Sequence, residues 1–295
     1  MRVLRPIAVA VLAALALSAS SAASVAPDAP VAVIGSAAIS AAAVDHWLVI
    51  ANDASQASTG KLAPPLPLPP TYAACIAALR TTPADSGDSA AQLRALCVAS
   101  YRRLVNDAMN YLIQAIWIEG EANARGVAVT AAQVKAEFAA QRKTSTPSLA
   151  TVAELDAFMA KSGQTIGDLK WRTRLNLLAR AIQAQVLRKA DHVSAAKIAA
   201  YYAAHRSQFA GESLTAASAK IRKAIVALQA AKASGALQRD FNHTWRERTV
   251  CRTGFKVAPS CGKFAAQPAA NPSASFPGAI ALPPSRPQTL VYKPS

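Results

Sequence analysis

The sequence predicts a mostly α-helical protein that opens with a small β-hairpin and closes with a disordered, proline-rich tail. Between Asp85 and Ala258 the chain holds one proline, Pro147, and because proline breaks helices this scarcity favours a long helical region. Hydrophobic residues make up 52% of the chain, much of it alanine, whereas aromatic residues make up only 6%. Alanine is the strongest helix former, so we expect closely packed helices with few large side chains.

The first residues are typical of a secretory signal peptide. Arg2 and Arg5 precede an apolar run from Ile7 to Leu17, and small residues follow it. A run of about eleven apolar residues is too short to cross a bilayer, which needs roughly twenty. We therefore predict a removed signal peptide over residues 1–26, with a retained anchor as the alternative. The mature protein is expected outside the cytosol, in the extracellular, cell-envelope or periplasmic space.

A hairpin and a helix are expected to follow. Residues 31–40 hold two short apolar stretches around Gly35, which is typical of a hairpin. Ser40 can then cap a helix that carries Trp47. Residues 52–70 are polar and then rich in proline, which predicts an extended loop.

Start and stop signals divide the central region into helices. Thr130, Thr151 and Thr165 are each followed three residues later by Gln, Glu or Asp, a spacing that satisfies the free amides at a helix start. Gly126 and Gly163 fit the ends of helices.

Two more helices and a tail complete the predicted fold. Ser194 is expected to cap a short helix, and a long helix runs from about Leu214 to Arg248. From Ala265 onward Pro, Ala and Ser dominate, so residues 265–295 are predicted to be a disordered tail without a packed core.

The four cysteines predict two disulfides, because an even number in an exported chain is typical of a disulfide framework. Four cysteines allow three pairings. We choose Cys75 with Cys97 and Cys251 with Cys261, because each bond then closes a loop within one segment. A redox or zinc site is the alternative, but the chain has neither a CxxC motif nor a nearby group of Cys and His.

The sequence carries none of the common motifs that would indicate an enzyme. The usual nucleophile, zinc-protease, phosphate-loop and dinucleotide motifs are absent, so we predict no catalytic residue, no cofactor and no metal. The four histidines, which we interpret as polar or partly buried helix residues, are His46, His192, His205 and His243. Asp45 beside His46, and Glu119 with Glu121, are interpreted as surface residues.

The chain is strongly basic, with 32 Lys and Arg against 16 Asp and Glu and a formal charge of +16. Such a charge attracts anionic partners, which include anionic lipid, cell-wall polymer, nucleic acid and acidic unfolded chains. Outside the cytosol nucleic acid is the weakest of these candidates. The sequence also lacks helix-turn-helix, zinc-finger and RNA-binding signatures, so no nucleic-acid partner is predicted.

Several segments carry a resemblance to a known family. They are the hairpin with the following Val44-Asp45-His46-Trp47, the helix start at residues 130–134, the segment at residues 193–209 and the closing stretch at residues 241–261. Together they look like the SurA- and PrsA-type foldases, which are exported chaperones that often carry a parvulin peptidyl-prolyl isomerase domain. Residues 193–209 are the most specific of the four, and the closing stretch resembles actinobacterial-type members.

The resemblance implies a SurA N-terminal-like helical chaperone domain over residues 31–264, built from both ends of the chain. In the family the parvulin domain follows the segment that ends here at Phe209. In this sequence Phe209 is followed by Ala210-Gly211-Glu212 and the last helix, so the inserted domain is missing and isomerase activity is not carried over. The hairpin turn also departs from the family, because its usual Asn-Gly-x-Pro is replaced here.

The leading hypothesis is an ATP-independent holdase that captures unfolded or nascent exported polypeptides in an apolar helical groove with basic rims. The residues expected in the groove are Trp47, Met109, Ile113, Trp117, Phe138, Phe158 and Trp171. Ordinary core packing is the competing interpretation of each. The alternative functions are a residual peptidyl-prolyl isomerase and a basic protein that attaches to the anionic cell envelope.

Overall fold

The computed structural model describes residues 27–59, 64–146, 148–255, 257, 260–265 and 280–281, and it is mostly helical, as predicted, with one small sheet. The predicted signal peptide at residues 1–26 lies outside the described residues. The α-helices are α1 (Ala41–Thr59), α2 (Ala73–Arg80), α3 (Ala90–Ala124), α4 (Ala131–Thr144), α5 (Val152–Ser162), α6 (Ile166–Ala190), α7 (Ala195–Ala204) and α8 (Leu214–Glu247). The short 3-10 helices are η1 (Arg206–Phe209) and η2 (Thr253–Phe255).

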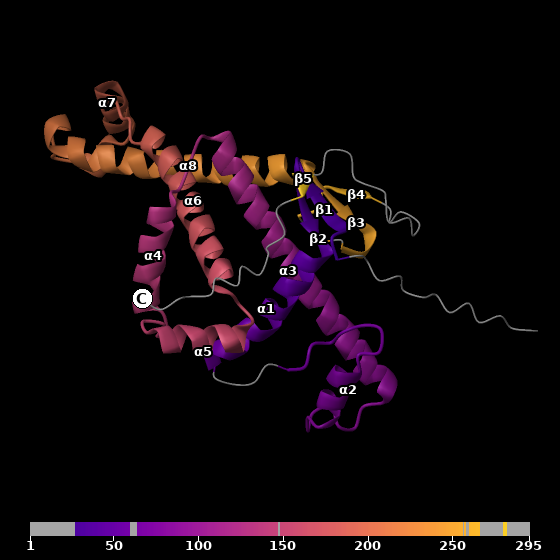
Figure 1. Ribbon diagram of the computed structural model, residues 1–295. Coiled ribbons are helices and arrows are strands. Elements are labelled where there is room, and N and C mark those ends of the chain that lie inside the picture. The colour runs from indigo at the N-terminus through magenta and orange to yellow at the C-terminus, as the bar shows by residue number, and fades with distance from the viewer. Residues whose placement is uncertain are drawn as a thin grey trace, which may run out of the picture.

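The sheet pairs strands from the first and the last segments that the structure describes (Figure 1). Its strands are β1 (Pro30–Ile34), β2 (Ala37–Ser40), β3 (Thr249–Arg252), β4 (Lys263–Ala265) and β5 (Ile280–Ala281), in the order β4-β3-β1-β2-β5. The predicted hairpin is confirmed, because β1 and β2 are antiparallel and turn at Gly35, whose φ is 59°. Strand β3 pairs antiparallel with β1, and β4 lies parallel to β3. A long chain of helices therefore begins and ends on the same sheet.

The predicted helix boundaries hold closely at the central helices. Thr130, Thr151 and Thr165 each accept a bond from the backbone N–H three residues later, and that residue's side chain bonds back to the threonine N–H. Gly126 and Gly163 have positive φ values of 64° and 63° just beyond α3 and α5. These local signals are confirmed because each is satisfied within a few residues of chain.

Two predicted segments need correction. The loop expected over residues 52–70 begins too early, since α1 continues to Thr59 and the first proline of the run is Pro64. Asn52 is buried, and its amide donates to the carbonyl of Pro64 at 2.9 Å, so the polar residue belongs to the packing rather than to a loop. Part of the predicted tail also forms strands, because Ala265 lies in β4 and β5 pairs parallel with β2. Strand pairing uses backbone groups, so a tail without a core can still add to a sheet edge.

The main core lies between the sheet, α1, α3 and the end of α8. Its fully buried side chains include Ile34, Val44, Leu104, Met109 and Ile113. We call this part, with α4, α5 and α6 packed around it, the body. Helix α3 is the central element, since it contacts α1, α2, α6 and the sheet.

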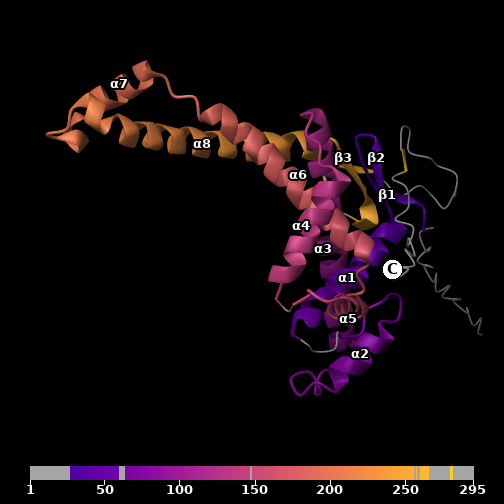
Figure 2. The same cartoon turned by 60° about the vertical axis from the view of Figure 1, so that its left-hand side comes forward.

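An arm projects from this body, as the turned view makes plain (Figure 2). It consists of α7, η1 and the first half of α8, residues 195–230. A separate small core holds it together, formed by Val193, Ile198, Ala217, Ile221 and Ile225. The arm therefore folds back on itself through α7 rather than resting on the sheet.

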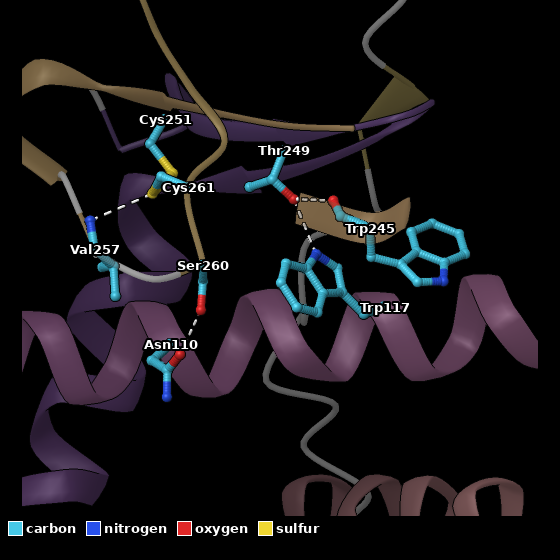
Figure 3. Close-up of a disulfide and its surroundings, with 8 residues drawn as sticks. All are labelled: Asn110, Trp117, Trp245, Thr249, Cys251, Val257, Ser260 and Cys261. Atoms are coloured by element: carbon cyan, nitrogen blue, oxygen red, sulfur yellow. Dashed lines mark hydrogen bonds between the residues drawn. A yellow bond between two sulfur atoms is a disulfide. The ribbon is translucent and has the colours of Figure 1, made fainter. Parts of the chain in front are cut away.

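The disulfide between Cys251 and Cys261 closes the C-terminal end of the sheet against α3 (Figure 3). Ser260 in this loop donates to the Asn110 side chain of α3 at 2.6 Å. Nearby, Thr249 accepts from the indole N–H of Trp117 at 2.9 Å and donates to the carbonyl of Trp245 at 2.7 Å. One buried hydroxyl thus joins α3, α8 and β3. The second predicted pair, Cys75 with Cys97, is also bonded and ties α2 to α3.

None of the helices in the described part of the chain combines the length and the apolar character needed to span a bilayer.

Candidate functional site

Most of the residues expected to line a groove belong to the core. Trp47, Met109, Ile113 and Trp117 are 7%, 0%, 0% and 4% exposed and lie in the main cluster. Their side chains therefore have no surface for a client, and the core interpretation applies to all four. The remaining three, Phe138, Phe158 and Trp171, are half-buried.

An open apolar groove of about 530 Å³ lies between α4 and α6, and Trp171 is the one expected residue that lines it. The other apolar lining residues are Val129, Ala131 and Val134, from the start of α4 and the turn before it. Lys135, Lys170 and Arg174 complete the lining. The groove thus has an apolar floor and cationic groups beside it, although Phe138 and Phe158 are not part of it.

Trp171 is held in place from the core side. Its ring packs against those of Trp47 and Tyr111, with centroids 5.5 and 5.8 Å away. Its indole N–H donates to a Glu119 carboxylate oxygen at 3.2 Å, and the same oxygen accepts from Arg174 at 2.5 Å. Because two rings and a carboxylate fix the indole, its remaining surface is presented to the groove in one orientation.

The cationic rim is only partly neutralised. Arg174 is paired with Glu119, so its charge is largely compensated. Within the described part of the chain, no carboxylate lies within ion-pair distance of Lys135 or Lys170. Two uncompensated ammonium groups therefore border the apolar floor, and they favour a partner that carries negative charge next to apolar side chains.

A hydrogen bond between two side chains behind Trp171 joins α1 to α6. His46 on α1 lies 3.0 Å from the Asp168 carboxylate at the start of α6. Burial raises the pKa of Asp168, but hydrogen bonds from His46 and from the Thr165 N–H and hydroxyl outweigh it and leave that pKa below its ordinary value. Asp168 is thus a carboxylate that caps a helix and accepts a long-range partner at once.

Tyr111, in the same cluster, is kept neutral. Burial raises its pKa to about 12, with Arg172 lowering it and Asp168 raising it by smaller amounts. Its hydroxyl is buried and has no hydrogen-bond partner among the described residues. At neutral pH the ring therefore acts as an apolar wall behind Trp171 rather than as an ionised base.

Sequence reasoning missed the pairings that build this site. Glu119 was interpreted as a surface residue and His46 as a polar or partly buried helix residue, and neither was assigned a partner. Their partners lie 52 and 122 residues away along the chain, where no local spacing rule applies. Arg180 likewise pairs with Glu137 of α4 at 2.6 Å. The basic residues of α6 were the signal that could have predicted these pairs, because acidic residues of α3 and α4 are their partners.

Comparisons with protein-family models, with curated proteins and with solved structures found no significant match. In the described residues no three His, Cys, Asp or Glu side chains are grouped as metal ligands would be. The function must therefore be argued from the groove itself.

Proposed function

We propose that this protein is an exported, ATP-independent holdase that binds unfolded segments of other exported proteins. The observation that carries the proposal is the groove between α4 and α6, with its apolar floor around Trp171 and two lysines that form no ion pair with any described residue. A floor of Val, Ala and Trp side chains can accept many apolar side chains, because hydrophobic contact is not directional. Such a surface suits a binder of many clients better than one specific ligand.

The size of the groove fits short segments rather than folded partners. Its volume of about 530 Å³ falls within the range of roughly 300–1,000 Å³ that is usual for ligand sites. If a client covered about 400 Å² of apolar surface, the gross gain at 25 cal/mol per Å² is about 10 kcal/mol. Association and ordering cost at least about 4 kcal/mol of that gain, which leaves about 6 kcal/mol and reversible binding on the order of tens of micromolar.

The proposed location outside the cytosol rests on the cysteines. All four form disulfides, and the described residues contain no free cysteine. Disulfides persist in oxidising compartments and are rare in the cytosol.

The arrangement of the chain supports the resemblance to SurA- and PrsA-type foldases. Strand β3, near the C-terminus, pairs with β1 of the first hairpin, so both ends of the chain build one unit. Between η1 and the start of α8 at Leu214 only a short turn intervenes, at the place where the family carries its parvulin domain. We propose that this chain keeps the client-binding region of a foldase scaffold and lacks the isomerase domain.

A matched pair of valine substitutions tests the groove. Val134→Asp places a carboxylate on the floor, whereas Val152→Asp introduces the same change at a 52% exposed position at the start of α5, away from the groove. Aggregation of a reduced, unfolding client is followed by light scattering at a near-equimolar ratio. We expect the wild type and Val152→Asp to suppress scattering equally and Val134→Asp to lose at least half of the suppression.

A wild-type protein that leaves the scattering unchanged would remove the holdase proposal. Equal suppression by both variants would remove the groove as the binding surface. Both substitutions lie on solvent-accessible turns of helices that start with a threonine cap, so we expect both variants to fold. Circular dichroism of each variant checks this and separates a loss of binding from a folding defect.

A further inference from the structure

A second pocket lies where the arm leaves the body, and the holdase proposal does not use it. It measures about 380 Å³ and is formed by the end of α6, the start of α7 and the middle of α8. Its lining residues are Val186, Lys189, Ala190, His192, Lys197, Gln229, Lys232, Ala233 and Ala236. At 1.5 Å per residue of helix, Lys189 is about 27 Å along α6 from Trp171, so the two sites are separate.

The charged groups of this pocket are all basic. Lys189, Lys197 and Lys232 come from three different helices and line the same pocket, as does His192. Among the described residues none of the three lysines has a carboxylate within 4.0 Å. Three like charges around one pocket repel each other, and an anion between them relieves that repulsion.

Gln229 forms hydrogen bonds to two other residues that line the pocket. With its amide turned so that both neighbours are satisfied, the nitrogen donates to the carbonyl of Ala190 at 2.7 Å and the oxygen accepts from the Lys197 ammonium at 3.0 Å. This bridge joins α6, α7 and α8 and directs Lys197 toward the pocket. The lysine is therefore positioned before any ligand arrives, which reduces the entropy lost on binding.

The surroundings strengthen the attraction. Residues 186–239, which make up the arm and its base, contain nine Lys and Arg but only two acids, Asp191 and Glu212. Glu212 is already paired with Lys220 at 2.8 Å. The arm therefore carries a positive field that draws anions to its base.

We propose that this pocket binds a phosphate group, either of a small soluble phosphate or of a lipid headgroup. A phosphate monoester carries about −1.5 to −2 charges at pH 7 and three acceptor oxygens, which matches three ammonium donors better than a single carboxylate does. The site fastens α6, α7 and α8 to one another through the ligand, so binding stabilises the base of the arm.

The test uses inorganic pyrophosphate as the soluble probe, titrated calorimetrically into the full mature chain at fixed ionic strength. The site variant is Lys197→Gln with Lys232→Gln. The control is Lys161→Gln with Lys223→Gln, which removes the same charge at exposed positions outside the pocket. We expect saturable binding that weakens at least tenfold in the site variant and less than twofold in the control.

A second arm of the experiment separates the two sources of phosphate. Vesicles of phosphatidylcholine with and without phosphatidic acid are sedimented with each protein. Loss of vesicle binding in the site variant alone assigns the pocket to a lipid headgroup, and pyrophosphate binding without vesicle binding assigns it to a soluble phosphate. Equal weakening of every ligand by the site and control variants, or no saturable binding by the wild type, overturns the proposal.

Discussion

The body and the arm are built from the same kinds of helix but are stabilised very differently. The main core of the body joins twenty-one buried residues from the sheet, α1, α3 and α8, and one disulfide closes it. The core of the arm has five buried residues from α7, α8 and the turn before α7, and no disulfide lies among its residues. Opening free energies follow buried apolar contact, so the arm should open far more often than the body.

The two candidate sites lie in regions that differ in this way. The groove lies on the body, where rings and a carboxylate fix Trp171, so this side chain has little conformational freedom left to lose when a client binds. The basic pocket lies where the arm leaves the body, lined by residues of α6, α7 and α8 and apart from the groove.

The largest expected effect comes from the same substitution made in each core. Ile113 in the body and Ile221 in the arm are both fully buried. Truncation to alanine costs about 2–5 kcal/mol through lost burial and the cavity left behind. We expect Ile113→Ala to lower the global free energy of unfolding by that amount in urea titrations. Ile221→Ala should instead speed hydrogen exchange within residues 195–230 and move the global midpoint much less.

Equal global destabilisation by the two variants would show that arm and body unfold as one unit and would break the comparison.

The next largest difference is expected between the effects of removing each of the two disulfides. Their loops span 10 and 22 residues, and chain entropy alone assigns each bond roughly 3 kcal/mol. Replacing Cys251 and Cys261 by alanine removes buried atoms from the main core, so the global midpoint should fall. Replacing Cys75 and Cys97 should mainly release α2, which packs on α3, and expose residues 73–90 to proteolysis.

If proteolysis of the Cys75 and Cys97 variant began in the sheet instead, α2 would have a structural role beyond its contact with α3.

A smaller effect is expected at the hydroxyl that joins three elements of the body. Thr249→Val keeps the shape of the side chain but leaves the Trp117 N–H and the Trp245 carbonyl without partners. An unsatisfied buried polar group costs about 1–3 kcal/mol. The exposed Thr215 of the arm is the control, since Thr215→Val should change the unfolding free energy by less than about 0.5 kcal/mol. Thermal unfolding followed by tryptophan fluorescence measures both.

The smallest effect is a pH dependence of the stability contributed by Asp168, whose carboxylate joins α6 to His46 of α1. The pKa of Asp168 is lowered in the folded state, so its carboxylate stabilises the fold above the unfolded-state pKa of about 3.9. That contribution is lost as the pH falls through the folded-state pKa. At pH 7 we expect Asp168→Asn to be about 1 kcal/mol less stable than the wild type, and the gap should close in acid below about pH 4.

The exposed Asp156 offers the control, since Asp156→Asn should show no such gap at any pH. A gap at Asp168 that stays constant down to pH 2 contradicts the assignment.

Local chemistry explains which features could be predicted from the sequence. The capping boxes at Thr130, Thr151 and Thr165 form because each threonine meets a partner three residues on, whatever the rest of the fold does. The hairpin is equally local. The disulfide pairings followed from short separations, although Cys75 and Cys97 proved to join two helices rather than one segment.

The residues of the groove could not be found this way. Trp47, Trp117 and Trp171 all looked like possible contact residues, because an aromatic side chain at helical spacing looks the same whether it faces a core or a client. Only the crossing of α1, α3 and α6 decided that Trp47 and Trp117 are buried and that Trp171 keeps a free surface.

By itself, then, the sequence determined the threonine-capped starts of the central helices, the hairpin and the two cysteine bonds, because these depend on partners close along the chain. Tertiary structure alone decided that β3 pairs with β1, that His46 meets Asp168 and that three lysines share one pocket. Those partners lie far apart in sequence, and their meeting depends on how whole helices cross and which faces they bury.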